Sequence, residues 1–370
     1  MNKKKLAIIC ADYRQTPLVH KAREMGIETH CFAWDRDDSV CKEIADFFHP
    51  ISILEKERIL DVCREIKIDG VTSIVFDRAV STVSYIAQGM GLIGNNYEDS
   101  LITTHKFLSR QVFEKHGIKS PRFAMAGDNV DLTGFKYPLI IKPVNCYSAV
   151  GVIKVDKKED LQKAVQWSQE RSNRNEIIIE EFITGLEATV DSISWNGKHY
   201  PLVIKERENI EGEKYPFKIA GHLPFELPFE IQEKILTETH KALDSINFMY
   251  GASNTQFRIN EDGEVFVIEI NPRMAGDFSY VLMKLHNGYD IVKGVIDVAL
   301  GQFEEPVFTE KKYSGVYFCR ENTEKIKHVI ENKENDPNIV EAELYKKDKI
   351  DRDRIGYFIY QSEQKRRWEI

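Results

Sequence analysis

The sequence has few cysteines, and none of them belongs to a C-x-x-C pair. Six scattered cysteines in 370 residues are typical of reduced thiols and argue against a disulfide scaffold. No apolar run approaches the ~18 residues that a membrane-spanning helix needs. The apolar stretch behind the N-terminal lysines, residues 6–11, is too short for a signal peptide. These absences predict a cytoplasmic protein that does not act at a membrane.

Positively charged residues are also fewer than negatively charged ones. Lysine and arginine number 51 against 59 aspartates and glutamates, so the formal net charge is −8. An acidic chain repels polyanions such as nucleic acids, although a local basic pocket for a phosphorylated ligand is compatible with it. We therefore expect a small-molecule partner rather than a nucleic acid.

Two common catalytic signatures are missing. The dinucleotide-binding fingerprint G-x-G-x-x-G does not follow the first expected strand, where the chain reads Ala11-Asp12-Tyr13-Arg14-Gln15-Thr16. This weighs against a nicotinamide-dependent oxidoreductase. No Ser-His-Asp or Cys-His pattern is found, so we do not expect a side-chain nucleophile.

The length and the pattern of the first hundred residues indicate several packed units. A single hydrophobic core rarely exceeds ~250–300 residues, so 370 residues predict two or three units. Short apolar runs alternate here with helical patterns, which is typical of a parallel sheet with crossover helices. Strands are expected at 6–10, 28–34 and 71–76, and helices at 15–25, 57–67 and 79–88.

The rest of the chain mixes helices with hairpins. Asn196-Gly197 and the residues 260–263 lie between apolar runs and predict two β-hairpins. An amphipathic pattern predicts a helix over 231–246. Further strands are expected at 137–143, 150–155 and 177–182, with helices at 103–116, 158–171 and 290–300 and short strands after 306.

The last strand of the second hairpin carries the most informative side chains. Alternation places Glu269 and Asn271 on one face together with Val267. In the simplest register of the hairpin, Gln256 opposes Val267 and so shares this face. Carboxylate and amide oxygens suit a hard cation such as Mg²⁺. Arg273 follows two residues later, and an arginine there suits a phosphate or a carboxylate.

Two further strand ends carry charged side chains. Lys142 leaves an apolar run and is suited to a phosphate. The loop after it, residues 144–151, contains one glycine and is therefore a weak phosphate-loop signal. Glu180 and Glu181 end another apolar run, where carboxylate and backbone groups suit an adenine or a ribose.

These motifs, in this order, resemble the ATP-grasp superfamily of carboxylate–amine ligases and their relatives. The resemblance spans residues 5–300 and rests on the strand ending in Lys142-Pro143, on E-E-F-I-x-G-x-E from Glu180 to Glu187 and on E-I-N-P-R from Glu269 to Arg273. The details look like the branch that contains carbamoyl-phosphate synthetase large subunits, biotin carboxylases and L-amino-acid ligases.

The resemblance implies a fold and a division of the chain. The implied fold class is α/β and α+β multidomain. A Rossmann-like domain is expected over 1–102, an ATP-grasp domain over 103–305 with a small lid subdomain at about 118–183, and a small C-terminal subdomain over 306–370. A homodimer is compatible with this organisation.

The resemblance also implies contacts with ATP, metal and substrate for the residues that match the motifs. The implied nucleotide contacts are Lys106 and Lys142 for the phosphates, Glu180 and the backbone of Glu181 and Ile183 for the adenine, and Glu187 for the ribose. The implied Mg²⁺ or Mn²⁺ ligands are Gln256, Glu269 and Asn271. Arg273, which binds the substrate carboxylate or acyl phosphate, and Lys142 are the implied catalytic residues.

Three departures from the family pattern bear on activity. The phosphate loop reads Val144-Asn145-Cys146-Tyr147-Ser148-Ala149-Val150-Gly151, where relatives carry several glycines. The upstream metal position, often a carboxylate, is Gln256. After Arg273, where relatives continue with paired glycines beside the substrate, this chain reads Met274-Ala275-Gly276-Asp277-Phe278.

Three more residues are candidates for the substrate side. His222, in Gly221-His222-Leu223-Pro224, matches a turn near the substrate of amino-acid ligases, and a structural turn histidine is an equal alternative. Lys205 and Arg207 end a strand and are candidates to approach the γ-phosphate or the substrate, but a solvated strand end is the stronger interpretation for both.

The sequence therefore predicts an ATP- and Mg²⁺-dependent, ADP-forming ligase. It would activate a carboxylate as an acyl phosphate and join it to an amine, with an amino acid as a candidate substrate. Two alternatives stay open: a bicarbonate-activating enzyme of the carbamoyl- or carboxyphosphate type, and a catalytically weak ATP-binding regulatory protein. The glycine-poor loop and Gln256 favour the regulatory alternative.

Overall fold

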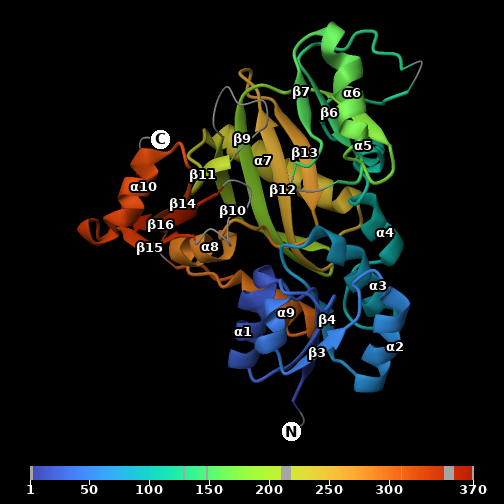
Figure 1. Cartoon of the computed structure of the whole chain (residues 1–370), viewed down its shortest axis with the longest axis vertical. Helices are drawn as coiled ribbons and strands as arrows, with labels where there is room; N and C mark the ends of the chain where they lie inside the picture. The colour runs from blue at the N-terminus through green and yellow to red at the C-terminus, as the bar shows by residue number, and fades with distance from the viewer. Residues whose placement is uncertain are drawn as a thin grey trace.

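The computed structural model describes residues 3–127, 130–146, 149–209, 218–309, 311–345 and 354–368. Tyr147 and Ser148 of the predicted phosphate loop lie outside these ranges. Within them the chain has a mixed α/β fold organised by three sheets (Figure 1). None of the helices in the described ranges is long and apolar enough to cross a membrane.

The first sheet is parallel and lies near the N-terminus, at the bottom of Figure 1. Its order is β3-β2-β1-β4. The strands are β1 (Lys5–Ile9), β2 (Glu28–Ala33), β3 (Phe47–Pro50) and β4 (Gly70–Thr72), and the helices between and after them are α1 (Thr16–Glu24), α2 (Lys56–Ile66), α3 (Val80–Met90) and α4 (Tyr97–Ile102). The alternation of strand and helix patterns predicted this parallel sheet, and the pairing confirms it.

The second sheet is small and antiparallel, and it forms the green lobe at the upper right of Figure 1. Its order is β5-β8-β6-β7. The elements are β5 (Phe123–Met125), β6 (Leu139–Pro143), β7 (Ile153–Val155), α6 (Leu161–Gln169) and β8 (Ile177–Glu181), preceded by α5 (Lys106–Lys115). Helix α6 packs its apolar side on the sheet, which buries Leu139, Ile141 and Ile179.

The third sheet is the largest in the described part of the chain, with the order β13-β12-β9-β10-β11-β14-β16-β15. Its strands are β9 (Leu186–Trp195), β10 (Lys198–Asn209), β11 (Lys218–Leu223), β12 (Gly251–Ile259), β13 (Val265–Asn271), β14 (Tyr313–Cys319), β15 (Ile339–Leu344) and β16 (Gly356–Ser362), and its helices include α7 (Phe229–Ser245) and α10 (Glu324–Glu331). Asn196 and Gly197 have φ angles of 50° and 75°, which the tight β9–β10 turn requires. The strands after residue 306 extend this sheet, and the domain boundaries stay predictions.

Helix α9 joins the first sheet to the third. Helices α8 (Ser279–Asn287) and α9 (Ile291–Ala299) pack on one face of the large sheet, and α9 also packs on α1 and β4. One buried cluster therefore contains Ile8 of β1, Ile193 of β9 and Val295 of α9. The opposite face of the large sheet is covered by α7 through a second cluster.

The register of the second hairpin differs from the simplest one. Gln256 pairs with Glu269, and a bulge shifts the register immediately after this pair. Ile268 is the additional residue, and its carbonyl accepts a hydrogen bond from Arg110 at 2.7 Å. Because a bulge breaks the alternation of side chains, Val267 lies in the α7-facing core and not beside Glu269. The predicted opposition of Gln256 and Val267 is therefore wrong.

Candidate functional site

One face of the large sheet changes from apolar to polar along three neighbouring strands. In each strand an apolar residue is followed, two positions along the same face, by a polar one: Ile193 and Asp191 in β9, Val203 and Lys205 in β10, and Ala252 and Asn254 in β12. The apolar members belong to the core shared with α8 and α9. The face of the large sheet that packs on α8 and α9 therefore becomes polar at Asp191, Lys205 and Asn254.

The three predicted metal ligands lie on this polar face. Cross-strand pairing places Gln256 opposite Glu269 and Asn254 opposite Asn271, and opposed residues share a face. The Asn271 side chain is buried, whereas that of Glu269 is 31% exposed. No cluster of three or more His, Cys, Asp or Glu in the described ranges could hold a metal. One carboxylate with neighbouring amide oxygens nevertheless fits a hard cation that keeps water or phosphate ligands.

Lys142 and Glu180 form a buried ion pair between the strands β6 and β8. Lys142 Nζ lies 2.7 Å from Glu180 Oε2, and Arg110 Nε of helix α5 lies 3.0 Å from Glu180 Oε1. Burial alone would raise the pKa of Glu180, but Arg110 and Lys142 outweigh burial and lower it. Glu180 is therefore ionised and compensates two cations. Its predicted contact with adenine stays a prediction.

Lys106 links helix α5 to the loop after β6 and to strand β13. Its Nζ donates to the carbonyl of Cys146 at 2.6 Å, and its backbone N–H donates to the carbonyl of Val144 at 2.8 Å. Nζ also lies 3.6 Å from Glu269 Oε1. The lysine thus stands between the described part of the predicted phosphate loop and the predicted metal carboxylate.

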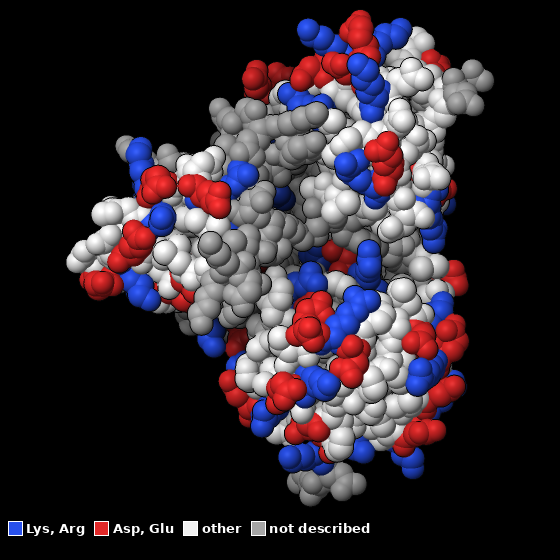
Figure 2. Space-filling model, viewed as in Figure 1, with Lys and Arg blue, Asp and Glu red and all other residues white. Residues whose placement is uncertain are grey.

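Several cations surround Glu269 and lower the pKa of its carboxyl group. Burial alone would raise this pKa, but nearby cations outweigh burial and hold it below its usual range: Lys106, Lys142, Arg273 and Arg110. Figure 2 shows Lys, Arg and acidic side chains around the hollow where the parts of the molecule meet. Lys106, Lys142 and Arg273 thus lie within electrostatic reach of Glu269, and their roles toward phosphate and substrate stay predictions.

Arg273 is held by the N-terminal part of the chain. Its Nε donates to Asp77 Oδ1 at 2.8 Å. Asp77 begins a short 3₁₀ turn after β4, close to where the strand leaves the sheet. Sequence reasoning missed Asp77, because the partner lies 196 positions away and no local pattern marks an aspartate in a loop.

Glu187, Arg207 and Lys205 lie beside this group on the same face. Glu187 Oε2 is 3.2 Å from Arg207 Nε, and Oε1 accepts from Arg258 on the other neighbouring strand. Lys205 is buried and donates to Asp191 at 3.0 Å and to Ser279 at 2.8 Å. The stronger interpretation of a solvated strand end is therefore wrong for Lys205, whereas Arg207 keeps a 29% exposed side chain beside Glu187.

One predicted residue, His222, lies away from this group. His222 belongs to strand β11 rather than to a turn, is 1% exposed and pairs with Tyr360 Oη at 3.0 Å. It opposes Glu206, which lies on the face opposite to Lys205 and Arg207. Glu181 accepts a hydrogen bond from the backbone of Lys136, and Ile183 follows the end of β8.

Several residues that complete the site carried only weak sequence signals. Asp191 interrupts an apolar strand in the same way as Glu269, so the same reasoning would have found it. Asn254 has this signal too, although an amide is less conspicuous than a charge. Arg110 had none, because an arginine in an amphipathic helix usually lies in solvent, whereas here it is buried.

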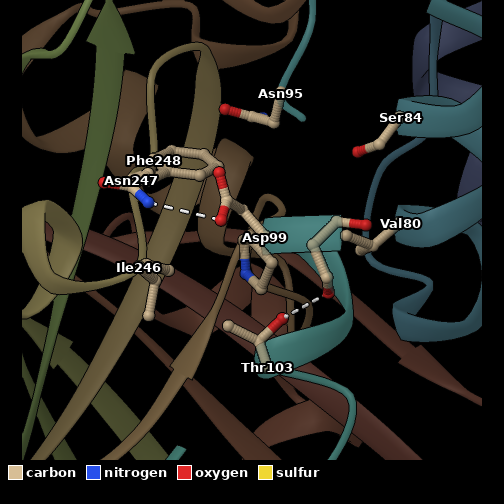
Figure 3. Close-up of a pocket in the computed structure, with 10 residues that line it drawn as sticks. Val80, Ser84, Asn95, Asp99, Thr103, Ile246, Asn247 and Phe248 are labelled. Atoms are coloured by element: carbon tan, nitrogen blue, oxygen red, sulfur yellow. Dashed lines mark hydrogen bonds between the residues drawn. The ribbon is translucent and has the colours of Figure 1, made fainter. Parts of the chain in front are cut away.

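Two cavities lie between the N-terminal part and the large sheet. The one drawn in Figure 3 has Asn247 donating to Asp99 at 3.3 Å across it. Its volume is about 10 Å³, which leaves room for at most one water molecule. The other measures about 70 Å³ and borders Arg273 and Ser73. Neither is lined by Lys106, Lys142 or Glu269.

Comparison with known proteins identifies the family of the central region. Residues 135–280 match the model of the ATP-grasp domain. The chain is similar to the D-alanine--D-alanine ligases of Lactococcus lactis (27% identity over 58% of this chain and 66% of that protein) and Geobacter sulfurreducens (29% over 51% and 62%). It therefore spans slightly less than two thirds of these relatives.

Solved structures resemble nearly the whole chain. The L-amino acid ligase from Bacillus licheniformis has a TM-score of 0.81 at 21% identity, covering 98% of this chain and 94% of that one. Phosphoribosylglycinamide synthetase from Anaerococcus prevotii has a TM-score of 0.78 at 20% identity, covering 98% and 95%. At such identities the likeness concerns the fold alone.

Proposed function

Since residues 135–280 make this chain a member of the ATP-grasp superfamily, we propose that it is an ATP- and Mg²⁺-dependent ligase that joins a carboxylate to an amine and forms ADP. The observation that carries the proposal is the convergence of Lys106, Lys142 and Arg273 around Glu269. Three cations beside one carboxylate suit a triphosphate with a metal ion. The names of the similar ligases favour an amino acid as the carboxylate substrate.

The proposed reaction has two steps. A substrate carboxylate oxygen attacks the γ-phosphorus of ATP, and the bond between the γ-phosphorus and the oxygen that bridges to the β-phosphate breaks. ADP departs, and the substrate is now an acyl phosphate. The amine nitrogen then attacks the carbonyl carbon, the carbon–oxygen bond to phosphate breaks, and the nitrogen loses a proton. Phosphoryl transfer depends mainly on positioning and on charge compensation, so no side-chain nucleophile is needed.

Each charged residue has a part in this scheme. Lys106 and Lys142 hold the phosphates, and their fixed bases on α5 and β6 keep the ammonium groups in place. Arg273 binds the reacting carboxylate, and Asp77 fixes the direction of its guanidinium group through Nε. Gln256, Glu269 and Asn271 would hold Mg²⁺, which neutralises phosphate charge when it is bound.

The finer assignments belong to the same proposal. They include a Rossmann-like domain over 1–102, an ATP-grasp domain over 103–305 and a C-terminal subdomain over 306–370. They also include adenine and ribose contacts through Glu180, Glu181, Ile183 and Glu187. We also propose a cytoplasmic location and a homodimer.

The proposal is tested by measuring ADP with Mg-ATP and a panel of carboxylates and amines, amino acids first. We expect ADP release that requires both partners. Glu269→Gln should reduce the rate at least ~100-fold, because it removes the carboxylate that would hold the metal ion against the phosphates. Glu264→Gln is the control, since Glu264 lies in the same hairpin and is exposed.

The other outcomes separate the alternatives. Release of ADP with bicarbonate alone would favour the carboxyphosphate type of enzyme. Binding of ATP without ADP release under any condition would contradict both enzymes and favour a regulatory ATP-binding protein. Full activity of Glu269→Gln would contradict the assignment of the metal ligands.

A further inference from the structure

The larger of the two cavities lies where the N-terminal part of the chain meets the large sheet. One wall comes from the end of β4, the loop after it and helix α3, and the other comes from the start of β12, residues 272–274 and α9. Strand β4 is an edge strand of the parallel sheet. Small molecules commonly bind at the carboxyl ends of parallel strands and between packed domains. The cavity therefore lies at a place in the fold that suits a ligand.

The wall beside Arg273 is held by the loop after β4. Val75 in this loop has a φ angle of 62°, a costly conformation for a β-branched residue that persists where the surroundings enforce it. A Cβ atom on Gly276 would lie 3.0 Å from Val75 Cγ1, so glycine allows the close approach of the two segments. Two residues after Val75, Asp77 accepts the hydrogen bond from Arg273. The loop and the segment after β13 are therefore held together at two points.

The lining of the cavity is mostly apolar. Arg273 is the only charged residue among the described residues that line it, and the other polar lining consists of hydroxyl and amide groups. The apolar side chains of the lining include Val71, Val80, Ile93, Met274, Val295 and Val298. A further charge in the cavity would lack a partner in this lining, whereas an aliphatic group gains free energy by leaving water. The lining therefore favours an apolar group next to Arg273.

The size of the cavity limits the group that enters it. Its volume is about 70 Å³. An apolar cavity of about 150 Å³ binds benzene, so a cavity of about half that volume suits roughly three or four aliphatic carbons. An aromatic side chain would require the walls to move.

We propose that this cavity receives the aliphatic chain of the substrate whose carboxylate Arg273 binds. The substrate class is then a carboxylic acid with a short aliphatic chain, and amino acids with such side chains belong to it. The inference rests on the proposed ligase function for the role of Arg273. A carboxylate bound by Arg273 brings the attached chain to the cavity that the same residue lines.

Equilibrium binding of a homologous series tests the proposal without turnover. Calorimetry on the full chain, with and without Mg²⁺ and a non-hydrolysable ATP analogue, compares propanoate, butanoate, pentanoate and heptanoate. We expect the affinity to rise about fourfold for each methylene up to pentanoate, because each one leaves water, and to gain nothing further at heptanoate. 3-Phenylpropanoate should bind no more tightly than pentanoate. Pentanamide, which lacks the charge that pairs with Arg273, should bind at least about tenfold more weakly than pentanoate.

One position in the cavity wall allows changes in both directions. Val80 of helix α3 is half-buried and lines both cavities, as its place in Figure 3 illustrates for the smaller one. Val80→Ala enlarges the larger cavity and should make heptanoate bind at least about threefold more tightly than pentanoate. Val80→Phe occupies the space and should remove the gain beyond propanoate. Val340→Phe, the same substitution at a 52% exposed position in β15, is the control and should leave the series unchanged.

The outcomes distinguish this proposal from the ligase function. An affinity that does not depend on chain length, equal binding of pentanoate and pentanamide, or an unchanged optimum in folded Val80→Ala would overturn the subsite. Val80→Ala decides alone if Val80→Phe does not fold. ADP release with charged and aliphatic carboxylates alike, unaffected by Val80→Ala, would overturn the subsite and leave the ligase intact. A chain-length preference that moves with Val80, without ADP release under any condition, would overturn the ligase and leave the subsite.

Discussion

At the scale of single residues, buried charges in this protein are shared. Glu180 compensates Lys142 and Arg110, Asp277 compensates two cations, and Glu187 lies between two arginines. Burying an isolated charge is prohibitive, and a shared carboxylate reduces the cost for both cations.

The pKa of Lys218 predicts a pH dependence of stability. Burial, opposed by Asp277, lowers this pKa to about 8, whereas an unfolded lysine titrates near ~10.4. Between these values the unfolded chain binds more protons than the folded one, so the contribution of Lys218 to stability rises with pH. We expect the free energy of unfolding of the wild type minus that of Lys218→Met to be flat below about pH 7 and to rise from about pH 8 to ~10. A falling difference in denaturant titrations would contradict the assignment.

Asp77 is predicted to act through Arg273. Asp77→Asn removes the charge that orients the guanidinium group, and a charge-assisted hydrogen bond contributes ~1.5–3 kcal/mol. We expect KM for the carboxylate substrate to rise about tenfold or more while KM for ATP stays unchanged. Asp77→Glu should recover part of the loss, and Asp61→Asn, an exposed change in α2, serves as the control. Equal effects on both KM values would indicate a merely structural role.

At the scale of elements, Arg110 connects three of them. From helix α5 it reaches Glu180 of β8 and the carbonyl of Ile268 at the bulge of β13. The bulge turns Glu269 onto the polar face while Val267 remains in the core. Helix α5, strand β8 and strand β13 are therefore linked to one another by a single guanidinium group.

Replacing this arginine should be costly. Arg110→Met leaves Glu180 with one cation and the bulge carbonyl without its donor, and breaking a buried pair typically costs ~3–5 kcal/mol. We expect a loss of this size in the free energy of unfolding from denaturant titration, whereas Arg64→Met should stay within ~0.5 kcal/mol. A loss below ~1 kcal/mol for Arg110→Met would show that the network does not hold these elements.

Elements with strong periodic patterns were predictable, and those without were not. The Asn196-Gly197 hairpin and the helix at 231–246 follow from local patterns. The bulge at Ile268 does not, because alternation cannot reveal an extra residue in one strand. Strand β3 is an edge strand with half-exposed side chains, so its sequence lacks the apolar run that marks a buried strand. Helix α8 begins after Phe278 without a capping side chain, so its sequence lacks the usual N-cap residue.

At the scale of the whole molecule, the candidate site is assembled from all three sheets. Lys142 and Glu180 come from the small sheet, Glu269 from the large sheet and Asp77 from the loop after the first. The motif residues were predictable, because a charge at the end of an apolar strand is visible locally. Their partners were not, since Asp77 and Arg273 lie 196 positions apart and meet only through tertiary packing.

The central claim is that the protein activates a carboxylate by phosphorylating it. It is tested most directly with a carboxylate substrate labelled with oxygen-18 in both carboxylate oxygens. If an acyl phosphate forms and an amine then displaces phosphate, one labelled oxygen moves to inorganic phosphate for each product formed. We predict one oxygen-18 atom per phosphate released, measured by mass spectrometry. Phosphate released without the label, in step with product, would contradict the account.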